Sequence, residues 1–198
     1  SYTIALTDTT EIKSYAFYNH STLAFIELNE GLTTIGEHAF KETKSLRTIP
    51  LPSTMKKIES NAFATSGVRS LIYFGTTQIT CDDTIFSGIE MEYVKAKRGF
   101  TGEKLCSEGT KEVKATIDDK GKSGEYLRYV VDTNEKEIFI YGIEEFYSDK
   151  TQREEIQKYQ TTIQKVIIDE GITIIRNETF KGFSAMTSIE FSSTVETI

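Results

Sequence analysis

The residues of this chain that could do covalent chemistry are few, and its two cysteines, Cys81 and Cys106, come first. In an oxidising compartment such a pair forms a disulfide, whereas a reducing compartment keeps both thiols free. Two cysteines and two histidines are too few for a structural zinc site of the usual four-ligand kind, so we expect no bound metal. The question that remains is whether the fold brings the two sulfurs together.

The patterns typical of catalytic residues are weak. His20 and His38 have no cysteine nucleophile and no serine motif near them in the sequence. The carboxylate pairs Glu144–Glu145 and Glu154–Glu155 could act as acid and base, but adjacent residues do not face each other. We therefore expect that the protein is not an enzyme.

Two short stretches resemble ligand-binding loops without completing them. Gly121-Lys122-Ser123 resembles the end of a phosphate-binding loop, but Thr116 stands where that loop requires a glycine. The pairs Asp82–Asp83 and Asp118–Asp119 lack the spacing of a calcium loop. We interpret both pairs as solvated turn residues, and we expect no cofactor.

The element that must position any functional side chain is a repeat. Phenylalanine recurs every 23 residues, and an isoleucine precedes it by five. A fixed period of this length is typical of a solenoid. Ile168–Ile175 (IDEGITII) then restates Leu28–Ile35 (LNEGLTTI), which indicates a second start of the same array. The repeated positions are Phe17, Phe40, Phe63, Phe86 and Phe180 for the ring, and Ile12, Ile35 and Ile58 for the aliphatic residue.

A second apolar set follows each phenylalanine with the spacing L-x-x-I-x-L. Its last two positions alternate as they would in a short strand, so we expect them to point into the core. A small residue precedes each of several rings, as in Ala39-Phe40, which suits a tight turn and predicts that the phenylalanines stack into a spine. The set reads Leu23, Ile26, Leu28; Leu46, Ile49, Leu51; Val68, Leu71, Tyr73; Met91, Val94, Ala96; and Met186, Ile189, Phe191.

The combination of Ile35, Ala39-Phe40, Leu46–Leu51 and Pro52 resembles the BspA-like leucine-rich repeat family. The resemblance covers residues 10–98 and 166–198, although Thr43 stands where the family usually has a cysteine. It implies a β-rich leucine-rich-repeat solenoid of the α/β superhelix type with 23-residue repeats. It also implies a surface-exposed adhesin or antigen, of the kind found in anaerobic bacteria and mucosal protists and implicated in attachment to host matrix or other cells.

We expect three parts. Residues 1–106 form a repeat array, closed by a cap where Lys97–Cys106 leave the period, because an open solenoid end exposes core and strand edges. Residues 107–165 form a linker, a β-hairpin and a short helix with Thr151 and Glu154 as its capping box, so that this junction joins two arrays. Residues 166–198 start the second array, and we expect the chain to be an excerpt of a longer one.

The predicted binding face is the outer side of the strands. Residues between the inward positions form two columns, and exposed aromatic side chains there would suit an interface. The alternative is that these side chains cover the sheet or pack against a neighbouring segment. Lys95, with Lys97 and Arg98, could meet an acidic glycan or simply form a polar rim. The candidate contact residues are Phe25, Glu27, Ile72, Tyr93 and Lys95, in columns with Thr48, Pro50 and Ser70.

The repeat also bears on the cysteines. Cys81 occupies the core position of Ile35 and Ile58, and Cys106 follows it by one period plus two residues. Stacked coils lie roughly 5 Å apart, and a disulfide needs Cα atoms about 4.4–6.8 Å apart. The geometry permits a Cys81–Cys106 bond, while two unpaired thiols stay the alternative.

The net charge of -7 disfavours nucleic acid and anionic membrane surfaces as partners. No apolar run approaches the roughly 20 residues of a membrane span, so we expect no direct membrane insertion in this segment. Asn19 and Asn177 are glycosylation acceptors if the source is eukaryotic. We expect a non-catalytic cell-surface or secreted adhesion module with a protein or glycan partner on a host or neighbouring cell. The alternative is a structural spacer or an intracellular scaffold that carries a domain outside this excerpt.

Overall fold

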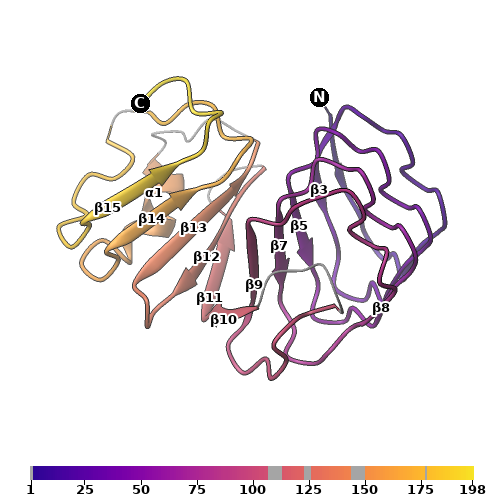
Figure 1. Ribbon diagram of the computed structural model, residues 1–198. Coiled ribbons are helices and arrows are strands. Elements are labelled where there is room, and N and C mark those ends of the chain that lie inside the picture. The colour runs from indigo at the N-terminus through magenta and orange to yellow at the C-terminus, as the bar shows by residue number, and fades with distance from the viewer. Residues whose placement is uncertain (1, 107–112, 123–125, 144–149, 177) are drawn as a thin grey trace. The chain divides into compact units, whose positions relative to one another are not determined.

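The computed structural model describes residues 2–106, 113–122, 126–143, 150–176 and 178–198. It divides into two compact units, residues 1–115 and 116–198, and each is described by itself (Figure 1). The division into 1–106, 107–165 and 166–198 stays a prediction.

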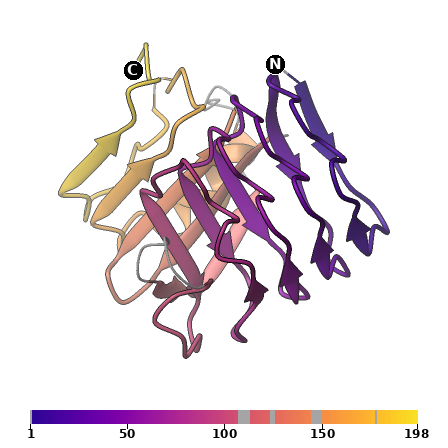
Figure 2. The same cartoon turned by 45° about the vertical axis from the view of Figure 1, so that its right-hand side comes forward.

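Unit 1 consists of stacked coils, each of which adds a strand to the same side of a solenoid (Figure 2). The strands of this side are β1 (Tyr2–Ala5), β3 (Leu23–Glu27), β5 (Thr48–Leu51), β7 (Ser70–Tyr73), β9 (Tyr93–Lys97) and β10 (Lys114–Ile117). β5, β7 and β9 pair in parallel, with partners such as Thr48, Ser70 and Tyr93, which confirms a repeat of about 23 residues. Pro50 has no amide hydrogen to donate toward the preceding coil, and β3 and β5 belong to separate sheets.

A second row of strands carries the repeated isoleucines. It is formed by β2 (Glu11–Ile12), β4 (Thr34–Ile35), β6 (Lys57–Ile58) and β8 (Thr80–Cys81), which pair in parallel in that order. Ile12, Ile35 and Ile58 are buried, and Cys81 is the direct strand partner of Ile58. Both rows of strands therefore enclose one apolar core, as the alternation in the sequence predicted.

The phenylalanine spine is confirmed. Phe17, Phe40, Phe63 and Phe86 stack with ring centroids 5.1, 5.2 and 5.6 Å apart and with planes within 15° of parallel. Phe40 and Phe63 are fully buried. Burial of each ring stabilises the array by about 2–3 kcal/mol.

The turns around the rings contain a backbone feature that the sequence did not reveal. His38 (φ 57°) and Glu42 (φ 65°), two residues before and after Phe40, adopt the left-handed conformation. This conformation costs a non-glycine residue roughly 1–2 kcal/mol. This conformational cost is offset because the N–H groups of residues 38, 40 and 42 all donate hydrogen bonds to carbonyls of the next coil, at 3.1, 2.7 and 3.2 Å. The same two positions are left-handed around Phe180, at Glu178 and Gly182.

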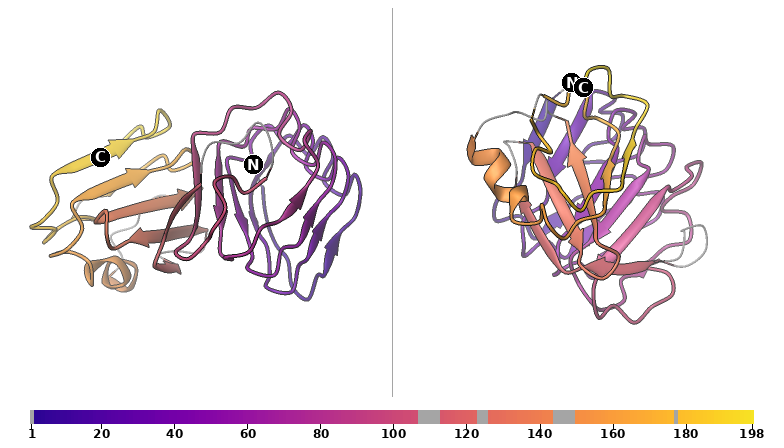
Figure 3. Two further views of the ribbon diagram at one scale, coloured as in Figure 1. Left: turned by 60° about the horizontal axis from the view of Figure 1, so that its bottom comes forward. Right: turned by 90° about the vertical axis from the view of Figure 1, so that its left-hand side faces the viewer.

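In its described residues, unit 2 has a five-stranded sheet with one helix beside it (Figure 3). The elements are β11 (Asp119–Lys122), β12 (Leu127–Asp132), β13 (Glu137–Gly142), α1 (Lys150–Gln157), β14 (Lys165–Ile168) and β15 (Ser188–Phe191). β12 and β13 form the predicted antiparallel hairpin, whereas β13, β14 and β15 pair in parallel. The parallel strands of the second set of repeats, β14 and β15, are thus added to the sheet beside the hairpin strand β13.

The helix differs from expectation at its start. α1 begins at Lys150, so Thr151 lies inside the helix and is not its N-cap. Ile156 is fully buried in the core of unit 2, and Tyr159 packs against that core. No helix among the described residues is long and apolar enough to cross a membrane.

Candidate binding surfaces

The outer face of the unit 1 sheet is less exposed than its sequence suggests. Phe25, Ile72 and Lys95 are 3%, 0% and 4% exposed, so the expectation that Phe25 and Ile72 face solvent is wrong. In-register pairing is one physical reason, because Ile72 lies between Pro50 and Lys95 on adjacent strands. The alternative interpretation, that such side chains cover the sheet, accounts for these two residues.

Two predicted contact residues on this face are partly accessible. Glu27 and Tyr93 are half-buried. Lys95 Nζ lies 5.9 Å from the centre of the Tyr93 ring, within cation–π range. A binding role for all five positions stays a prediction, and Tyr93 is the aromatic side chain among them that a partner could still reach.

Exposed aromatic side chains are found instead at the phenylalanine turns. Tyr15 and Tyr18 are 53% and 44% exposed, and their rings meet edge to face at 5.8 Å. Tyr15 also stacks on His38 of the next coil, with centroids 4.8 Å apart. Tyr15 and His38 occupy the same repeat position one period apart, and neither residue was among the predicted contacts.

The cysteine and asparagine positions lie at separate places in the fold. Cys81 and Cys106 are joined by a disulfide with Cα atoms 5.4 Å apart. Cys106 is buried, and Gln78 Nε2 donates to the neighbouring carbonyl of Leu105 at 2.9 Å. Asn19 is exposed in a turn at φ 58°. Asn177 lies outside the described residues.

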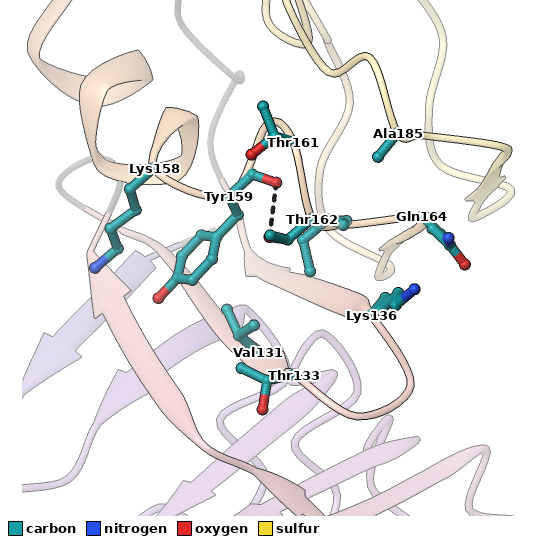
Figure 4. Close-up of a pocket in the computed structure, with 10 residues that line it drawn as sticks. Val131, Thr133, Lys136, Lys158, Tyr159, Thr161, Thr162, Gln164 and Ala185 are labelled. Carbon is teal, nitrogen blue, oxygen red and sulfur yellow. Dashed lines mark hydrogen bonds between the residues drawn. The ribbon is translucent and has the colours of Figure 1, made fainter.

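Unit 2 contains a pocket of about 500 Å³ that the sequence did not predict. Its walls come from the hairpin turn, the loop after α1 and the turn before β15 (Figure 4). Val131 and Ile163 form an apolar floor, and Thr161, Gln164 and Lys136 supply polar groups. Parallel pairing of β13 with β14 brings these segments together, and nothing local in the sequence indicates that pairing.

One side of this pocket carries a hydrogen-bonded cluster. Asp119 accepts from Tyr159, from Lys158 at 3.3 Å and from the Lys120 amide at 2.8 Å. Burial opposes ionisation, but the bond from Tyr159 and the other two donors hold the pKa of Asp119 below its usual value. Burial and the bond to Asp119 raise the pKa of the Tyr159 phenol. Lys158 also lies over the rings of Tyr129 and Tyr159, at 5.9 and 5.1 Å.

The other chemical candidates do not converge. Gly121 and Lys122 belong to strand β11, so they do not form a phosphate-binding turn. Glu154 and Glu155 are exposed, whereas Glu144 and Glu145 lie outside the described residues. Within the described ranges, no group of three or more His, Cys, Asp or Glu side chains could hold a metal ion.

The stacked coils, the repeated strands and the apolar spine define a leucine-rich-repeat solenoid. A family model, described as BspA type leucine rich repeat region, matches residues 2–104 and 153–198 with six copies. The chain therefore belongs to the BspA-type leucine-rich repeat family. Comparison with curated proteins and with solved structures gave no significant match.

Proposed function

We propose that the protein is a non-catalytic, cell-surface or secreted adhesion module whose repeat surface meets a protein or glycan on a host or neighbouring cell. The observation that carries the proposal is the BspA-type repeat, which spans most of the chain and is typical of repeat-based interaction modules. Solenoids of this kind present extended surfaces and build partner contacts from several coils at once.

The disulfide supports the exported location. Such bonds form and persist in oxidising compartments and are rare in the cytosol. Cys81 belongs to the last paired strand of its row, and Cys106 follows the departure from the repeat. The bond therefore joins the irregular end of the array to its last regular coil, where a solenoid exposes its core.

Two surfaces of unit 1 are the candidates for the contact. One is the strand face with Glu27 and Tyr93, and the other is the exposed Tyr15–Tyr18 pair in the first coil. Tyrosine is enriched at interface hot spots because it offers a large rigid surface with a polar tip.

Two linked assays test the proposal. Antibody against the chain should label intact source cells, and external protease should remove the label. Beads coated with the 198-residue chain should adhere to partner cells, with soluble chain as competitor. Tyr93→Ala and the paired Tyr15→Ala/Tyr18→Ala variant, each with unchanged circular dichroism, then assign the contact to one surface. Labelling only after permeabilisation would instead favour an intracellular scaffold.

A further inference from the structure

We propose that the pocket of unit 2 binds a carboxylated sugar, such as a uronic acid residue of an acidic glycan. Its volume of about 500 Å³ lies within the range of small-molecule sites. A sugar has apolar ring faces and polar edges, and the pocket offers an apolar floor of Val131 and Ile163 beneath polar side chains. The proposed adhesion surfaces of unit 1 do not include this pocket.

The positive charge comes from Lys136. Its side chain is exposed, and among the described residues it makes no hydrogen bond or ion pair. The acids of the adjacent strands are engaged elsewhere: Glu137 and Glu190 both pair with Lys165, at 3.6 and 2.7 Å. Lys158 is held by Asp119, so Lys136 is the lysine of the pocket that can meet a ligand carboxylate.

Hydroxyl and amide groups complete the site. Thr161 and Gln164 are exposed pocket residues with no side-chain hydrogen bond inside the described part of the chain. Each can both donate and accept, which is what sugar hydroxyls require. In Figure 4 the ends of Lys136 and Gln164 lie together on one side of the pocket, away from Lys158 and the Tyr159 hydroxyl. A carboxylate on that side would reach the Lys136 ammonium and the Gln164 amide together.

The backbone fixes these groups before any ligand arrives. Asp132 accepts from the amides of Asn134 and Glu135, both at 3.0 Å, and shapes the hairpin turn. The turn is then tied to the opposite wall, because the Gln164 amide donates to the Lys136 carbonyl at 2.8 Å. Lys136 itself sits at φ 53° in this turn. A pre-formed site loses less entropy on binding, which favours recognition of a small ligand.

The experiment compares methyl glucuronide with methyl glucoside, which differ at the carboxylate, on the full chain by amide chemical-shift mapping. Only the glucuronide should shift the amides of Thr161, Gln164 and Lys136 at low concentration. Lys136→Gln should weaken its binding by about threefold or more, the scale of a partly exposed ion pair. Lys181→Gln is the matched control, since Lys181 is an exposed lysine of unit 2 that pairs with Glu178 and does not line the pocket.

Equal shifts with both sugars, shifts outside the pocket, or no shifts at all would overturn the proposal. So would unchanged glucuronide binding in Lys136→Gln. These outcomes would not decide the adhesion proposal, because the adhesion assay assigns the contact with variants of the tyrosines of unit 1.

Discussion

Phe40 and Phe63 stack with their centroids 5.2 Å apart and their planes 5° from parallel, one coil directly upon the next. Both side chains are fully buried, and each ring contacts a ring on either side of it. The pair shows how one residue type at one spacing holds the array together.

Replacing a central ring should therefore unfold unit 1 more easily. Phe63→Ala should lower its free energy of unfolding by about 3–5 kcal/mol, because it removes a buried ring and leaves a cavity. Phe17→Ala is the matched control, since Phe17 has the same repeat position but is only half-buried. Urea unfolding of both variants measures the difference. Equal losses of unfolding free energy at the two positions would contradict the claim that a fully buried ring of the stack stabilises unit 1 more than a half-buried one.

Tyr93 is the next test, and it addresses recognition instead of stability. Once a partner is identified, Tyr93→Ala should weaken its binding by about 1 kcal/mol or more, the usual scale for an interface hot spot. Glu27→Ala, tested beside it at the other half-buried predicted contact of this face, should give a similar loss if both positions contribute. Titration calorimetry measures both, with circular dichroism to establish that the fold is intact. Unchanged affinity in both variants would remove the strand face as the binding surface.

The Asp119 cluster predicts a pH-dependent stability. The pKa of Asp119 is lowered in the folded state from its ordinary 3.8. Its contribution to the stability of unit 2 is therefore fully present above that value. It is lost as the pH falls through the lower folded value. Asp119→Asn should cost unit 2 up to about 1 kcal/mol at neutral pH, since the carboxylate is partly exposed. The difference in the free energy of unfolding between wild type and Asp119→Asn, measured with urea, should shrink as the pH is lowered.

Tyr159→Phe serves as the paired variant for the same cluster. It removes the phenol that donates to Asp119, so its effect should overlap with that of Asp119→Asn. The loss of unfolding free energy in the double variant should be smaller than the sum of the losses in the two single variants. Fully additive losses, or a gap that stays constant with pH, would show that the bond contributes nothing to folding.

The sequence was sufficient for the architecture because the fold is itself periodic. Phenylalanine and isoleucine at fixed spacing predicted the spine, the parallel strands and the neighbourhood of Cys81 and Cys106. What it could not supply was the exposure of each strand face. Phe25 and Ile72 alternate as exposed residues do, yet they are 3% and 0% exposed. Alternation does not encode how closely neighbours such as Pro50 and Lys95 flank Ile72.

The pocket was missed for a related reason. Lys136, Thr161 and Gln164 come from two loops outside the positions of the repeated phenylalanines and isoleucines, and they meet because β13 pairs with β14. The left-handed turns at His38 and Glu42 were missed because a positive φ is uncommon for any residue other than glycine, and glutamate is not among the types enriched there, although histidine is. Hydrogen bonds from these turns to the next coil stabilise this conformation, and such long-range bonds leave no local pattern.

The state of Cys81 and Cys106 in the source cells tests the exported location most directly. Cells are quenched in acid, the chain is unfolded and its free thiols are alkylated before any reduction, and the intact mass is measured. An exported adhesion module should take up no alkyl group before reduction and two afterwards, because its two cysteines form one bond. Two alkylated thiols in the unreduced chain would contradict the account and place the protein in a reducing compartment.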